Sequence, residues 1–104
     1  MAANEPSDRE LLSAHISVPE HVVYRDFAED TVILNLDSGM YHGLNGTAAK
    51  MLETLSSGVS VEDAIASLAE EFGQPREVIE RDVVTFVRGL AERGLIELDD
   101  SAAG

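Results

Sequence analysis

The sequence predicts an α+β domain that is winged-helix-like, with a three-stranded antiparallel sheet followed by three helices. Two observations support this prediction. Three stretches rich in β-branched and aromatic residues come first, and three stretches with apolar residues at helical spacing follow them. A chain of 104 residues, of which 44% are apolar, is long enough for one modest core and too short for two. The strands and helices are therefore expected to share a single core.

The three strands are expected at residues 21–27, 31–36 and 40–44. In the second strand Val32, Leu34 and Leu36 alternate onto one face. An acidic spacer separates the first two strands, and Asp-Ser-Gly separates the last two. Gly39 supplies the positive φ that a tight turn favours. The pattern predicts a meander of two hairpins.

Each of the three helices has its own start signal. Asn45 and Ser60 are candidate N-caps for the first two helices, and Pro75 is expected at the first position of the third. The helices are expected to end at glycines: Gly58, Gly73 and Gly94. The residues after the last glycine, Leu-Ile-Glu-Leu at 95–98, are consistent with one short strand.

The domain is expected to span residues 21–98, between a flexible arm at 1–20 and a flexible tail at 99–104. The arm contains two prolines and scattered charges, with only short apolar patches. One extended piece is expected within it, near Ile16 to Val18.

Composition excludes several classes of function. Twenty acidic residues against seven basic ones give a formal net charge of −13, which repels phosphate backbones, so nucleic acid is not an expected partner. Without cysteine there is no disulfide, thiol nucleophile or Cys-ligated metal. Neither a signal peptide nor an apolar run of the roughly 20 residues that span a membrane is found. We expect a cytoplasmic protein without a membrane partner.

No catalytic, cofactor or metal site is predicted. The histidines at 15, 21 and 42 lack the helical spacing of a zinc-binding pair. The serines and threonines lie mostly at expected caps and turns, without a nucleophile motif. The chain is therefore not expected to be an enzyme.

The third expected helix has two apolar strips. On a helical wheel the core stripe is formed by Ile79, Val83, Phe86 and Leu90. A second strip contains Val84, Val87 and Ala91, and it is bordered by Arg81 and Arg88. The second strip can be interpreted in two ways. Either the helix is buried over a wide face that includes this strip, or the strip forms one wall of a binding groove.

A set of segments occurs in a characteristic order within the region from about His21 to Leu98. The segments are Leu36-Asp37-Ser38-Gly39, Tyr41-His42-Gly43-Leu44-Asn45, Thr47-Ala48-Ala49, Ser60 to Ile65, Asp82-Val83 and Leu90 to Ile96. In this order they resemble the PqqD family. Gly46 departs from the family pattern, which often has a proline at the start of this helix.

The resemblance implies a RiPP precursor peptide recognition element, a non-catalytic domain that binds the leader of a ribosomally made peptide. In such domains the third strand accepts the leader as a further strand, and the last helix forms the other wall. The peptide-binding residues implied here are Met40, Tyr41, His42, Gly43, Leu44, Arg81, Val84, Val87, Arg88 and Ala91. The implied role is to present the precursor to a lasso-type leader protease and cyclase, or to a radical SAM enzyme as in pyrroloquinoline quinone synthesis.

Two other functions are consistent with the pattern. A winged-helix DNA-binding domain has similar helix periodicity, although the charge argues against it. A self-associating module would pair the sheet edge with a second copy. For the recognition element we expect a monomer or weak dimer, and we favour a lasso-type precursor over the quinone pathway.

Overall fold

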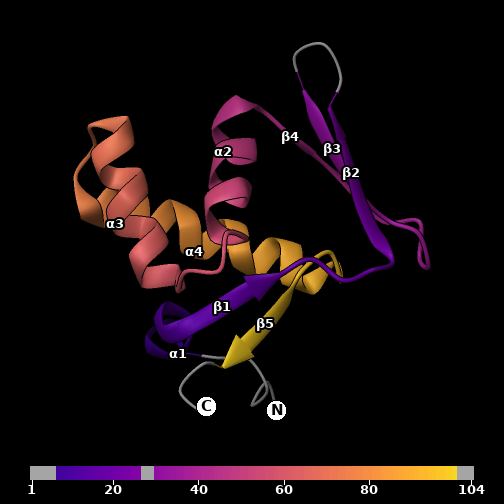
Figure 1. Ribbon diagram of the computed structural model, residues 1–104, viewed down its shortest axis with the longest axis horizontal. Coiled ribbons are helices and arrows are strands. Elements are labelled where there is room, and N and C mark those ends of the chain that lie inside the picture. The colour runs from indigo at the N-terminus through magenta and orange to yellow at the C-terminus, as the bar shows by residue number, and fades with distance from the viewer. Residues whose placement is uncertain (1–6, 27–29, 101–104) are drawn as a thin grey trace.

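The computed structural model describes residues 7–26 and 30–100 (Figure 1). The elements are α1 (Asp8–Ser13), β1 (Ala14–Ser17), β2 (Val22–Asp26), β3 (Thr31–Asn35), β4 (Tyr41–Leu44), α2 (Gly46–Leu55), α3 (Val61–Phe72), α4 (Arg76–Glu92) and β5 (Glu97–Asp100). The predicted α+β class is confirmed, with an antiparallel sheet β2-β3-β4 followed by three helices. Residue 27, expected at the end of the first strand, and residues 28–29 of the expected acidic turn lie outside the described part of the chain.

The sheet has one face toward the core and one face outward. Along β3, Ile33 is fully buried, whereas its neighbours Val32 and Leu34 are half-buried and Leu36 beyond the strand is 59% exposed. Successive side chains of a strand point to opposite faces, so Ile33 belongs to the inner face. The alternating apolar residues of the predicted strand therefore lie on the outer face.

The helix caps follow the sequence signals. The Asn45 side chain accepts a hydrogen bond from the Ala48 N–H at 2.8 Å, and the Ser60 hydroxyl accepts one from the Asp63 N–H at 3.1 Å. Gly73 ends α3 in the left-handed conformation, with φ of 64°. Pro75 is the N-cap of α4 rather than its first residue, because the helix begins at Arg76.

The N-terminal segment differs from the flexible arm expected over residues 1–20. Residues 8–13 form α1, and β1 pairs antiparallel with β5, with Ile16 opposite Leu98. Leu11 and Ile16 are 1% and 5% exposed and belong to the core. Residues 8–17 thus form a helix and a strand where a flexible arm was expected, because Leu11 and Ile16 pack against distant parts of the chain. Residues 1–6 lie outside the described residues.

The two sheets lie at different ends of the molecule. Figure 1 shows the β1–β5 ribbon below the helices and the three-stranded sheet beside α2. Asp99 and Asp100, which were expected in a flexible tail, belong to β5, and residues 101–104 lie outside the described residues. Within the described residues, no helix is both long enough and apolar enough to cross a membrane.

Candidate functional site

The open edge of the three-stranded sheet is formed by β4. This strand pairs with β3, with Gly43 opposite Val32 and Tyr41 opposite Leu34. Among the described residues no strand pairs with the other side of β4. The edge is therefore available to an extended peptide.

The register determines which backbone groups face this edge. The Asn35 N–H donates to the Met40 carbonyl and the Asn35 carbonyl accepts from the Gly39 N–H, both at 2.8 Å, so the backbone groups of Asn35 face the β4 side of β3. Bonded and non-bonded pairs alternate along an antiparallel ladder. His42 and Leu44 therefore direct their backbone groups toward β3. Tyr41 and Gly43 direct theirs outward, each with one donor and one acceptor.

The predicted peptide-binding residues of this strand differ in burial. Tyr41 is 67% exposed and Met40 is 47% exposed. His42 is half-buried, and Leu44 is 1% exposed because its side chain belongs to the core. The Leu44 side chain thus anchors the end of β4 rather than facing solvent.

The exposed wall of α4 is narrower than the sequence predicts. Val87 is fully buried in the core, together with Ile79, Val83 and Leu90. Phe86, expected in the core stripe, is half-buried. The buried arc of the helix is thus rotated toward Val87 relative to the predicted stripe, because α4 packs at an angle that periodicity alone does not specify.

The other predicted binding residues of α4 lie at or near the surface. Arg81 is exposed, and the half-buried residues are Val84, Arg88 and Ala91. A surface pocket of about 330 Å³ lies at the N-terminal half of α4. Its lining residues are Glu77, Glu80, Arg81, Val84 and Thr85. All of these residues belong to α4, so this pocket does not extend to β4.

The sequence analysis missed one residue that connects the two walls. The Asn35 side chain is buried at the end of β3, and its amide donates to the Gly94 carbonyl after α4 at 3.0 Å. Its carbonyl oxygen accepts from the Asp37 and Ser38 N–H groups at 2.9 and 3.2 Å. Asn35 therefore holds the turn before β4 against the end of α4. The signal in the sequence is an asparagine near the end of a strand, with Asp-Ser at the second and third positions after it.

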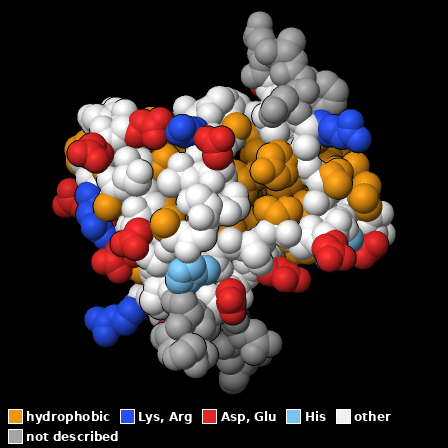
Figure 2. Space-filling model, viewed as in Figure 1, with side chains coloured by type: hydrophobic (Ala, Val, Ile, Leu, Met, Phe, Trp, Pro, Cys, Tyr) orange, Lys and Arg blue, Asp and Glu red, His pale blue; other side chains and the backbone are white. Residues whose placement is uncertain are grey.

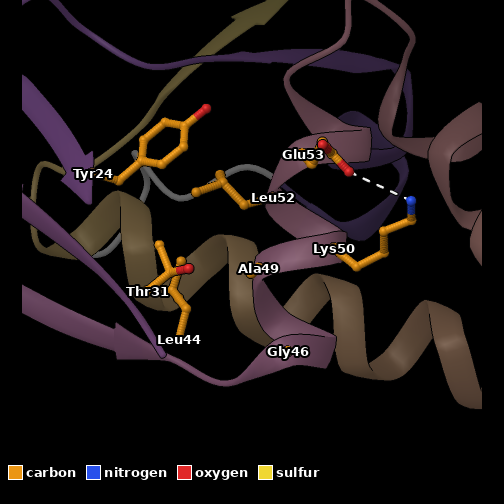
Figure 3. Close-up of a pocket in the computed structure, with 8 residues that line it drawn as sticks. All are labelled: Tyr24, Thr31, Leu44, Gly46, Ala49, Lys50, Leu52 and Glu53. Carbon is orange, nitrogen blue, oxygen red and sulfur yellow. Dashed lines mark hydrogen bonds and ion pairs between the residues drawn. The ribbon is translucent and has the colours of Figure 1, made fainter. Parts of the chain in front are cut away.

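A second hollow, which the sequence did not predict, lies between the inner face of the sheet and α2 (Figure 3). Its volume is about 300 Å³. The lining residues are Tyr24, Thr31, Leu44, Gly46, Ala49, Lys50, Leu52 and Glu53. Figure 2 shows apolar side chains gathered where the sheet meets α2.

Lys50 at the margin of this hollow is already paired. Its ammonium lies 3.3 Å from the Glu71 carboxylate and 3.4 Å from that of Glu53. The hydrogen bond and charge of Glu71, and then those of Glu53, raise the pKa of Lys50. In Figure 3 the ammonium points toward Glu53 and away from Tyr24.

Within residues 7–26 and 30–100, no group of three or more acidic or histidine side chains is arranged to hold a metal ion.

Comparisons with known proteins give one matching family and two similar solved structures. Residues 30–96 match the family described as Coenzyme PQQ synthesis protein D (PqqD). No curated protein matches the chain. Two solved structures are similar to it over most of their length.

The first structure is TbiB1 in complex with the TbiA(beta) leader peptide. It is 28% identical in sequence, with a TM-score of 0.70, and the match covers 78% of this chain and 94% of that chain. The second structure is a lasso peptide synthetase B1 complexed with the leader peptide. It is 30% identical, with a TM-score of 0.73, and the match covers 81% of this chain and 99% of the other.

Proposed function

This chain belongs to the PqqD family, and from that premise we propose that it is a non-catalytic recognition element that binds the leader of a precursor peptide. The observation that carries the proposal is the open edge of β4, where Tyr41 and Gly43 direct their backbone groups outward. Both similar solved structures contain a leader peptide. The leader would add to β4 as a fourth strand.

Strand addition satisfies the unpaired backbone groups of the edge, while side-chain contacts select the sequence that binds. A dissociation constant near 1 μM corresponds to a binding free energy of about 8 kcal/mol. Four backbone hydrogen bonds at about 1 kcal/mol each, together with a few buried apolar side chains, supply a gain of this order. The loss of conformational freedom in a flexible leader opposes that gain.

We assign the selective contacts to β4 and α4. The exposed Met40 and Tyr41 and the half-buried His42 lie along the edge. On α4, Val84 and Ala91 would contact apolar leader residues, whereas Arg81 and Arg88 would attract acidic ones. Val87 supports this wall from the core and does not contact the leader.

The proposed role also includes presentation of the bound precursor to a tailoring enzyme. The bound leader would hold the precursor next to a tailoring enzyme, and the similarity to a lasso peptide synthetase B1 favours a leader protease and cyclase over a radical SAM enzyme. The net charge of −13 would favour an enzyme with a basic docking surface.

The test is an NMR titration of the isotope-labelled chain with the leader half of the precursor peptide encoded beside it. We expect the amide shifts to be concentrated in residues 40–44 and on the exposed face of residues 81–91. An absence of shifts at high micromolar leader, or shifts confined to β2 at the opposite edge, would contradict the proposal. Sedimentation at several protein concentrations separates leader binding from pairing between two copies.

A further inference from the structure

Gly43 in β4 has no explanation within the chain itself. Its φ lies outside the positive range that favours glycine, and a Cβ built at this position meets no atom within 4 Å. A glycine inside a strand weakens the strand relative to alanine. Neither backbone conformation nor crowding in the unbound chain therefore requires a glycine here.

The surroundings of Gly43 on the outer face of the sheet are apolar. Val32 lies directly opposite on β3, and Tyr41 lies two residues earlier on the same face of β4. Val32 is half-buried, and Tyr41 is 67% exposed. Because Gly43 has no side chain and a Cβ there would meet no atom within 4 Å, the space over Gly43 beside Val32 and Tyr41 is open.

A peptide that adds to this edge would pair directly with Gly43, because the backbone groups of Gly43 face outward. Residues directly opposite each other in neighbouring strands share a face, with Cβ atoms about 5 Å apart. A long side chain at the opposite position would cross the glycine and reach Val32. A flat ring suits this space, because aromatic side chains cover exposed strand glycines and pair well with β-branched neighbours.

We propose that the outer face over Gly43 is a subsite for an aromatic side chain of the bound peptide, flanked by Tyr41 and Val32. This inference rests on the proposed addition of the leader to β4. It assigns a role to the outer face of the sheet, whereas the wall of α4 would contact leader residues that point to the inner face. The subsite selects leaders that have an aromatic residue at the position paired with Gly43.

The first experiment measures leader affinity by calorimetry for the wild-type chain, Gly43→Ala and Gly43→Val. We expect Gly43→Ala to weaken binding about threefold and Gly43→Val at least tenfold. Gly46→Ala is the matched control, since a Cβ at Gly46 also meets nothing within 4 Å and its φ is also outside the positive range. This control is expected to change affinity less than twofold.

A double-mutant cycle then identifies the leader residue. Replacing each aromatic residue of the leader by alanine should reveal one whose loss weakens binding to the wild-type chain about tenfold. The same replacement should weaken binding to Gly43→Val less than twofold, because the valine side chain already keeps the ring out of the space over residue 43. Equal effects in both backgrounds at every aromatic position would overturn the subsite.

A third measurement uses the unmodified chain, so it does not depend on how the variants fold. The α-protons of Gly43 should shift upfield when the natural leader binds, because the ring lies over them. That shift should disappear with the leader variant in which the coupled aromatic residue is alanine. Leader binding without any upfield shift at Gly43 would reject the aromatic subsite and leave strand addition intact. No binding to the wild-type chain would instead reject the proposed function itself.

Discussion

The buried side chain of Asn35 joins two segments of the chain that are distant in sequence. Its side chain makes three hydrogen bonds, which join the turn between β3 and β4 to Gly94, the second residue after α4. Gly94, which provides the acceptor, has a φ of 68°, and a Cβ there would lie 3.2 Å from the Asn35 amide nitrogen. Both the asparagine and the glycine are therefore needed for this junction.

We expect Asn35→Ala to lower the free energy of unfolding by about 2–3 kcal/mol, because two N–H groups and one carbonyl lose a partner in a partly buried site. Urea unfolding measures the change. Asn45→Ala is the control, since it removes one exposed N-cap bond and is expected to cost about 1 kcal/mol. Equal losses in the two variants would contradict the special role of Asn35.

The half-buried Val84 is the residue of α4 on which the proposed groove most depends. We expect Val84→Glu to weaken leader binding at least tenfold, about 1.4 kcal/mol, because a carboxylate replaces an apolar contact. Titration calorimetry measures the affinity, and circular dichroism checks that the helix content is kept. Ala66→Glu places the same charge on an exposed position of α3 and should leave affinity unchanged. Unchanged affinity in Val84→Glu would remove α4 from the site.

At the scale of elements, α1 and β1 stabilise the domain by bringing the N-terminal segment to the helices and β5. The capping box of Ser7 and Glu10 starts α1, with both reciprocal hydrogen bonds present at 3.2 and 2.9 Å. A helix of six residues is too short to be stable alone. Its stability therefore comes from Leu11 in the core.

We expect Leu11→Ala to lower the free energy of unfolding by about 2–4 kcal/mol, because it leaves a cavity at a fully enclosed position. Leu12→Ala, at the half-buried neighbouring position, should cost less than half as much. Chemical denaturation of both variants makes the comparison. If Leu11→Ala is as stable as the wild type, the N-terminal segment does not contribute to the core.

At the scale of the whole molecule, charge is distributed unevenly. Residues 75–93 contain four arginines and four acidic residues, so the rest of the chain contributes the entire net charge of −13. The segment of residues 75–93, which contains α4, is consequently a neutral part of a strongly acidic chain. Self-repulsion of this kind destabilises the compact state and is screened by salt.

We therefore expect the urea midpoint of unfolding to rise when sodium chloride increases from about 20 to 200 mM, over which the screening length falls below about 10 Å. Urea is used because it is uncharged and leaves ionic strength constant. A falling midpoint would mean that exposed ion pairs, such as Lys50 with Glu71, outweigh the general repulsion.

The sequence by itself determined the local features of this protein. The periodicity of apolar residues and the turn residues predicted the strands of the meander and the three helices. The residue types at the helix ends predicted the caps at Asn45, Ser60 and Gly73. These signals depend on residues within a few positions of one another, so they can be read without the fold. The ordered set of motifs also identified the PqqD family correctly.

Only the tertiary structure decided what is buried and which segments meet. It buried Val87 in the core, turned Val32 and Leu34 to the outer face, enclosed Leu11, and joined Asn35 to Gly94 across the domain. Each of these outcomes depends on how an element packs against partners distant in sequence, and the angle of that packing leaves no periodic signal. A pattern can thus show that a helix has two apolar strips, but only the packed neighbours determine which strip stays at the surface.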